Sequence, residues 1–231
     1  MIIKASDYKY PSRDELVKIY AEEPILSNFG FPYVNEMESL FTGESDFKTV
    51  HRSQHLYWWD NVLVNRIGNL SRTYAVALVN FDRGFSDDFK EMKEEQYINR
   101  FQFELYAENY YYFFSSIKDT VAQIINVYFN LEFAEDSVYL GKLTKKLTNQ
   151  SVNEALLRFK DDTVLTTEYR NAFTHRFPIT QVDYRPQIDS KNTKYYSMEQ
   201  PAVKSSILKS DILQSFLALS VLLDKLRVEM R

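Results

Sequence analysis

The sequence predicts an all-α protein, an up-and-down four-helix bundle with short additional helices. Glycine is scarce, because the 231 residues contain 5, whereas average usage near 7% would give about 16. Neither glycine nor proline occurs between Gly84 and Gly141, so nothing in that stretch forces a turn. Apolar side chains recur every three or four residues in the longest segments, which is the period of a helix with one buried face.

The first long helix is expected in the first third of the chain. A short helix precedes it, beginning at Ser12, because Ser12 followed by Glu15 forms a capping-box pattern. The long helix then runs from about Asp46 to Asn80 with one buried stripe. Its apolar members are Leu56, Trp59, Leu63, Ile67, Leu70, Tyr74 and Leu78.

The second long helix is expected from Ser86 to about Asn130, since Ser86, Asp87 and Asp88 are typical of a helix start. Its middle carries a belt of aromatic side chains that covers the whole circumference of the helix. At least part of such a belt must be buried on more than one side, as a domain core together with a subunit interface would do. Stacking of bases would explain some of it too, although aromatic residues at helical spacing usually belong to a core. The belt consists of Phe101, Phe103, Tyr106, Tyr110, Tyr111, Tyr112, Phe113 and Phe114.

Shorter helices are expected in the second half of the chain. Ser151 and Glu154 form another capping-box pattern, which predicts a helix from Ser151 to about Phe159. A further helix spans residues 163–176 and must stop before Pro178, because the residue before a proline avoids helical geometry.

A small hairpin or loop is expected near residues 180–197, where apolar and polar residues alternate. The last helix then runs from about Lys204 to Glu229. Seven apolar residues form its inner stripe at helical spacing. They are Ile207, Ile212, Phe216, Leu219, Leu222, Leu223 and Leu226.

Composition excludes several classes of protein. The chain has no cysteine, so it has no disulfide, no zinc–thiolate site and no thiol nucleophile. The first eleven residues lack the apolar run of a signal peptide, and the longest apolar stretches are too short to cross a bilayer. No glycine-rich nucleotide loop is present. A soluble, cytoplasmic protein without cofactor is therefore expected.

Charge is distributed unevenly. The net charge of −4 argues against broad nonspecific binding to nucleic acid. Residues 142–194, however, contain ten Lys or Arg and six Asp or Glu, a local balance of +4. This segment can hold phosphate, or it simply reflects an uneven surface.

The segment from Arg170 to His175 carries the most informative pattern. On a helical wheel, Leu165, Tyr169, Ala172 and Phe173 form the core-facing stripe, and the polar residues lie opposite. A guanidinium, an amide and an imidazole thus lie within about one helical turn. The polar residues are Arg170, Asn171, Thr174 and His175.

These groups suit cleavage of a phosphodiester without a metal. The imidazole of His175 can take a proton from a ribose 2′-hydroxyl or give one to the leaving 5′-oxygen. The guanidinium of Arg170 can hold the phosphate oxygens, and Asn171 can orient either partner. One chain offers a single histidine here, whereas the reaction needs an acid and a base. A two-fold homodimer would supply both.

An Arg directly followed by Asn, with a His five positions after the Arg, on a helix of an all-α bundle, resembles the HEPN superfamily. The resemblance implies a HEPN domain over residues 46–231 and an extension over residues 1–45. It implies a dimeric, metal-independent endoribonuclease in toxin–antitoxin or phage-defence systems, with a possible antitoxin partner. Other members are non-cleaving modules that bind nucleotide, RNA or protein.

Carried over to this chain, the resemblance makes Arg170 and His175 catalytic and Asn171 supporting. Four further residues of the polar face and the basic segment are expected to bind RNA phosphates: Thr174, Arg176, Arg158 and Lys160.

Two other interpretations remain open. In the first, Arg170 pairs with Glu168 or another carboxylate, and His175 only stabilises the helix end. In the second, His51 and His55, four residues apart on one helix face, bind a metal with His175 as third ligand.

Overall fold

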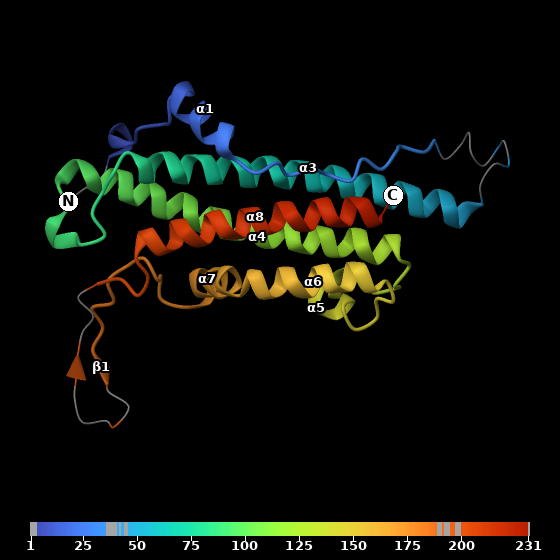
Figure 1. The fold of residues 1–231 in the computed structure, drawn as a ribbon. Helices are drawn as coiled ribbons and strands as arrows, with labels where there is room; N and C mark the ends of the chain where they lie inside the picture. Colours follow the sequence, from blue (N-terminus) through green and yellow to red (C-terminus); the bar gives the residue numbers. More distant parts are fainter. Residues whose placement is uncertain are drawn as a thin grey trace. The chain divides into compact units, whose positions relative to one another are not determined.

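The computed structural model describes residues 4–35, 41, 43, 46–188, 191, 195–196 and 200–230. Helices dominate the described part of the chain, and their succession can be followed by colour in Figure 1. In chain order the elements are η1 (Ala5–Asp7), α1 (Arg13–Glu22), α3 (Phe47–Asp82), η2 (Phe89–Glu91), α4 (Glu94–Tyr128), η3 (Glu135–Ser137), α5 (Leu140–Leu143), α6 (Gln150–Asp162), α7 (Val164–His175), β1 (Gln187–Ile188), β2 (Tyr195–Tyr196) and α8 (Ser205–Glu229).

The chain forms two compact units, and the three longest helices contribute a segment to each. Unit 1 consists of Met1–Glu23, Ser71–Tyr112 and Val164–Ser215. Unit 2 consists of Pro24–Leu70, Phe113–Thr163 and Phe216–Arg231.

Unit 1 packs segments of α3, α4 and α8 with α7. The rings of Tyr74 on α3 and Tyr110 on α4 lie 6.5 Å apart, and the Tyr110 hydroxyl is 2.8 Å from Ser215 Oγ on α8. Tyr111 stacks on Phe173 of α7 at a centroid distance of 5.6 Å. Tyr110 and Tyr111 are fully buried, so much of the aromatic belt belongs to the core of the chain itself.

Unit 2 packs segments of the same three helices with α6. Arg66 on α3 donates to the Ser116 carbonyl on α4 at 2.7 Å. Phe114 on α4 lies against Phe159 on α6, with ring centroids 5.9 Å apart. Ser151 on α6 donates to Glu229 on α8. In each unit, segments of α3, α4 and α8 thus pack with one further helix, α7 or α6, and the predicted all-α helical-bundle class is confirmed.

Arg83, at the end of α3, fastens the N-terminal residues within unit 1. Its guanidinium pairs with both oxygens of Glu15 on α1, at 2.8 and 3.0 Å, and donates to the carbonyls of Lys9 and Tyr10. The hydrogen bonds from Arg83 lower the pKa of Glu15 to about 2. The predicted division of the chain after residue 45 stays a prediction, since residues 36–40, 42, 44 and 45 lie outside the described part.

Asp60 organises the irregular segment of unit 2 that precedes α3. This buried carboxylate accepts hydrogen bonds from Asn28 Nδ2 and from the backbone N–H groups of Phe29, Gly30 and Phe31, at 2.7–3.3 Å. Gly30 has a φ of +74°, a left-handed conformation that glycine adopts without a Cβ clash.

The predicted start of the second long helix is wrong by eight residues. Ser86, Asp87 and Asp88 lie before the short η2 turn, and α4 begins at Glu94. The acidic side chains have other partners, because Asp87 accepts from Ser206 and Asp88 accepts from Gln200 and from the Lys90 N–H. These contacts hold the segment against Gln200 and Ser206, which lie just before α8 and in its first turn. The acidic side chains therefore do not cap α4.

The predicted capping box at Ser151 is also wrong. Helix α6 begins one residue earlier, and Asn149 is its N-cap, with the side-chain oxygen accepting from the Val152 N–H. The Ser151 hydroxyl is used to contact Glu229 at 2.7 Å. A tertiary contact has therefore replaced the local cap that the sequence favoured.

The predicted hairpin is present in reduced form. Strands β1 and β2 pair antiparallel, with Gln187 opposite Tyr196 and Ile188 opposite Tyr195. Residues 189–190, 192–194 and 197 of the predicted hairpin lie outside the described part. In α8, Ile207 is exposed, whereas Leu208 is fully buried, so the stripe is one residue out of phase at its start.

Helix α8 is long and apolar enough to cross a membrane, in contrast to the prediction that no stretch is. Half of its most apolar window is buried inside the chain. The buried members include Ile212, Phe216, Leu219 and Leu223, which pack in the helical core. The apolar character of α8 is thus explained by its place in the bundle.

Asp211 is a buried carboxyl on α8 that contacts α7 in unit 1. Thr166 of α7 donates to its Oδ1 at 3.2 Å. Burial raises the pKa of Asp211, although Tyr111 and Thr166 partly offset this by favouring the charged form. The Tyr111 hydroxyl and Asp211 Oδ2 are both buried. Within the described residues, neither atom has a hydrogen-bond partner with regular geometry.

Replacing Asp211 by Asn is expected to stabilise the protein at neutral pH. Because the folded-state pKa is above the unfolded value, folding of the wild type binds a proton, and its stability falls as pH rises through the folded pKa. The slope contributed by one such group is at most about 1.4 kcal/mol per pH unit. The Asp211→Asn variant lacks this dependence of stability on pH. Urea unfolding at pH 4 and pH 7.5 should therefore show a higher free energy of unfolding than that of the wild type only at pH 7.5.

Asp161→Asn, at an exposed position on α6, is the matched control for removal of one carboxylate. It is expected to leave the pH dependence of unfolding close to that of the wild type. A lower stability of Asp211→Asn at pH 7.5 would contradict the assignment of a destabilising buried charge.

Candidate functional site

Helix α7 is turned slightly from the orientation that the sequence predicts. Thr166 is 1% exposed and faces Asp211, whereas Leu165, predicted to face the core, is 52% exposed. Ala172 and Phe173 are buried as predicted. Because 166, 170 and 173 follow one another at spacings of four and three, the position of Arg170 adjoins the buried face.

Arg170 accordingly lies at the edge of the core and not on the fully exposed side. Its Nη1 donates to Asn171 Oδ1 at 3.1 Å, while its Nε is buried and has no hydrogen-bond partner in the described part of the chain. No described carboxylate forms an ion pair with it, so the proposed pairing with Glu168 is not made. A buried donor without acceptor costs about 1–3 kcal/mol.

Asn171 and His175 are exposed and share the outer side of α7, one turn apart. The amide oxygen of Asn171 orients the guanidinium of Arg170. Thr174 is exposed, and its hydroxyl donates to the Arg170 carbonyl at 2.9 Å. Positions 170 and 175 are about 140° apart around the helix, so within one chain the guanidinium and the imidazole do not converge on one atom.

Tyr112 on α4 contacts an acidic side chain one turn earlier on the same helix. Its hydroxyl donates to Glu108 Oε1 at 2.8 Å. Burial and Glu108 raise the pKa of Tyr112, and Thr174 and Arg170 act in the opposite direction. Tyr112 therefore contacts the acidic side chain, and its pKa is also influenced by the positive charge of Arg170.

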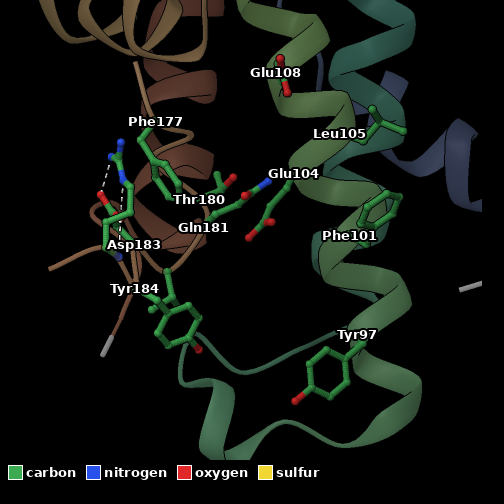
Figure 2. A pocket seen from close by; sticks show the side chains of 12 residues that line it. Tyr97, Phe101, Glu104, Leu105, Glu108, Phe177, Thr180, Gln181, Asp183 and Tyr184 are labelled. Carbon is green, nitrogen blue, oxygen red and sulfur yellow. Dashed lines mark hydrogen bonds and ion pairs between the residues drawn. The ribbon is translucent and has the colours of Figure 1, made fainter. Parts of the chain in front are cut away.

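A pocket of about 940 Å³ lies between α4 and the segment 177–185 that follows α7 in unit 1. Figure 2 shows Gln181 extending toward Glu104 across it, with Tyr97 and Tyr184 near one end and Glu108 on the α4 wall. Its lining residues are Tyr97, Phe101, Glu104, Leu105, Glu108, Phe177, Thr180, Gln181, Val182, Asp183, Tyr184 and Arg185.

The charges of the pocket do not favour a phosphate. Arg185, the one cation among its described lining residues, is paired with Asp183 at 2.7 Å and lies over the Phe177 ring at 4.5 Å. Burial raises the pKa of Glu104, which accepts from Arg100 at 2.7 Å. Aromatic walls with carboxylate and amide acceptors suit the stacking and edge recognition of a nucleobase.

The other predicted phosphate-binding residues divide between the two units. Arg176 is exposed directly after α7 in unit 1. Arg158 and Lys160 are exposed on α6 in unit 2, and Arg158 lies 3.8 Å from Asp162. Their predicted role in RNA binding stays a prediction. Asp189 and Lys194 of the basic segment lie outside the described residues.

The metal interpretation of His51 and His55 gains no support. Their rings are 4.2 Å apart, but no group of three or more His, Cys, Asp or Glu side chains suited to a metal occurs in the described part of the chain. The nearby carboxylate Asp60 already accepts four hydrogen bonds from the segment before α3.

Comparison with known protein families assigns the fold. The family model of the Cthe2314-like HEPN proteins matches residues 59–226, well over half of the chain and including all of α7. The chain belongs to this HEPN family. Searches among curated proteins and among solved structures gave no match. The resemblance inferred from Arg170, Asn171 and His175 is therefore confirmed at the level of the superfamily.

In this HEPN protein, sequence reasoning missed Glu108, Tyr112 and Asp211. Tyr112 belongs to the aromatic belt, which was interpreted as packing, and Glu108 lies one turn before it on the same face of α4. Asp211 is a carboxylate between the apolar residues Leu208 and Ile212, and such an interruption of a buried stripe is a recognisable sign of a buried polar contact.

Because the guanidinium of Arg170 forms no ion pair with a described carboxylate, we predict that inorganic phosphate stabilises this HEPN protein. An anion that binds only the folded state adds about 1.4 kcal/mol at ten times its Kd. Thermal unfolding with and without phosphate should show this shift for the wild type and a smaller one for Arg170→Gln. Arg227→Gln, which removes a cation near Asp224, is the matched control and should respond like the wild type. Equal shifts in all three proteins would contradict an anion site at Arg170.

Proposed function

We propose that this HEPN protein is a metal-independent endoribonuclease that cleaves RNA at a site composed of two copies of α7. The observation that carries the proposal is the unpaired guanidinium of Arg170, oriented by Asn171 one turn before an exposed His175. A cation without a carboxylate partner favours binding of a phosphodiester. Membership of the HEPN family gives the fold in which the proposed site lies, and the assignment of activity rests on these side chains.

A second copy of the chain would supply the catalytic groups that a single α7 cannot direct at one phosphate. Since Arg170 and His175 diverge by about 140°, one copy cannot direct both at one phosphate. A two-fold axis beside α7 would place two imidazoles and two guanidinium groups around one cleft. The exposed side of α7 with Asn171 and His175 is free for that contact within the described residues.

The chemistry needs one proton acceptor and one proton donor. A neutral His175 takes the proton of the ribose 2′-hydroxyl while the 2′-oxygen attacks phosphorus. The P–O5′ bond breaks, and the protonated His175 of the second copy gives its proton to the 5′-oxygen. Arg170 stabilises the negative charge on the non-bridging oxygens. The products are a 2′,3′-cyclic phosphate and a 5′-hydroxyl.

The proposal also includes a cellular role for the cleavage. An RNA-cleaving HEPN protein must be restrained in its own cell, so a cytoplasmic role in a toxin–antitoxin pair or in phage defence fits the proposed activity. The acidic pocket between α4 and residues 177–185 would hold a base next to the scissile phosphate.

Cleavage of single-stranded RNA in the presence of EDTA tests the activity. The wild type is expected to produce 2′,3′-cyclic phosphate ends, and His175→Ala to be slower by about 10²–10⁴, the range for loss of a general acid or base. Arg170→Ala is expected to be comparably impaired. Glu168→Gln, exposed on the same helix, is the matched control and should cleave at the wild-type rate.

No cleavage by the wild type at high protein concentration, together with phosphate or RNA binding that depends on Arg170, would replace this proposal by a non-cleaving module. Cleavage by His175→Ala at the wild-type rate would remove His175 from the mechanism.

Mixed dimers test the composite site. Wild type and His175→Ala are coexpressed at varied ratios, so that copies combine at random. If both imidazoles serve one site, activity falls as the square of the wild-type fraction, because a mixed dimer lacks either the acid or the base. A linear dependence would show that each copy cleaves alone and would overturn the shared site.

A further inference from the structure

A ladder of three rings runs along one face of α3 in unit 2. Phe47, His51 and His55 follow one another at intervals of four residues, so they lie one above the other on the helix. The ring centroids are 6.1 Å apart for Phe47 and His51, and 4.2 Å apart for His51 and His55. All three are exposed, with Phe47 at 69%, so this aromatic row is not part of the core.

A cationic row runs beside the ladder. Lys48 and Arg52 are also four residues apart, and both are exposed. The Arg52 guanidinium lies over the Tyr128 ring at 5.4 Å and donates to the Tyr128 carbonyl. Those contacts fix its position and leave further donors of the five-donor guanidinium for a ligand.

The two rows border one hollow of about 590 Å³, which α3 forms with the end of α4 and the turn that follows. Asn126 and Asn130 also line it, and Glu132 is the one carboxylate among the described lining residues. Burial and the proximity of His51 lower the pKa of His55, against the effect of Glu135. Its imidazole is therefore neutral near pH 7.5 and able to stack.

We infer that this hollow binds single-stranded nucleic acid, with bases stacked on the ladder of Phe47, His51 and His55 and the backbone phosphates held by Lys48 and Arg52. The inference extends the proposed function by naming a second contact for the RNA strand, on a different unit from α7. Its support is separate, because none of the residues of the hollow belongs to α7.

The arrangement fits a strand better than other phosphate ligands. Stacking of successive bases on aromatic rings, beside a groove that tracks the backbone, is how proteins hold single strands without reading sequence. Inorganic phosphate would use the cations but not the rings. A duplex would meet the cations but has no free base faces to stack.

Fluorescence anisotropy with a labelled ten-nucleotide single-stranded RNA tests the inference, in a His175→Ala background so that the probe is not cut. The ladder variant Phe47→Ala with His51→Ala is expected to bind at least tenfold more weakly, as loss of stacked bases implies. Lys48→Gln should reduce the slope of log affinity against log salt by about 0.7. Lys225→Gln, a cation already paired with Glu229, is the matched control.

Circular dichroism and thermal unfolding verify that the variants are folded. If the duplex of equal length and AMP both bind more weakly than the single-stranded RNA, the result supports a single strand as the ligand. If AMP binds with equal affinity, the result overturns the inference in favour of a free nucleotide as the ligand. Binding of the RNA that is unchanged in the folded ladder variant would overturn the inference, whatever the cleavage assay shows. Ladder-dependent binding without cleavage by the wild type would leave the inference standing and remove the proposed nuclease.

Discussion

The packing of α7 against α4 and α8 in unit 1 is the constraint on which the candidate site depends. Phe173 stacks on Tyr111, and Thr166 donates to Asp211. These two contacts fix the rotation of α7 about its axis. The helical period then decides that Arg170 lies at the edge of the core and that His175 projects outward. A rotation by one residue that put Arg170 in the direction of Asn171 would expose it fully, so the environment of the polar residues follows from apolar packing.

The arginine side chains of the polar sites differ in whether a carboxylate neutralises them. Arg83 and Arg185 are matched by carboxylates, and the cost of holding those charges is offset by regular ion pairs. Within the described residues, Arg170 has the amide of Asn171 as its side-chain partner and a buried Nε without acceptor. The contrast matters, because an acidic protein offers many carboxylates that could neutralise a guanidinium.

The long helices could be predicted from sequence because their signal is redundant. Leu63, Leu70 and Leu78 repeat one apolar period over many turns, and an error at one position changes nothing. Helix starts have no such redundancy. Asp87 and Ser151 look like capping residues but are used for contacts with Ser206 and Glu229, residues distant in sequence. A local pattern cannot show that a distant partner competes for the same side chain.

The sequence by itself determined the all-α class, the position of α7 and the presence of Arg170, Asn171 and His175 on it, because periodicity and spacing are local properties. Tertiary structure alone decided that Thr166 and not Leu165 faces inward, that Arg170 forms no ion pair with a carboxylate of the described residues, and that Tyr112 donates to Glu108. It also decided that Phe47, His51 and His55 share a hollow with residues at the end of α4. Each of these depends on which residues far apart in the chain compete for one contact, and that competition is settled only when the helices pack.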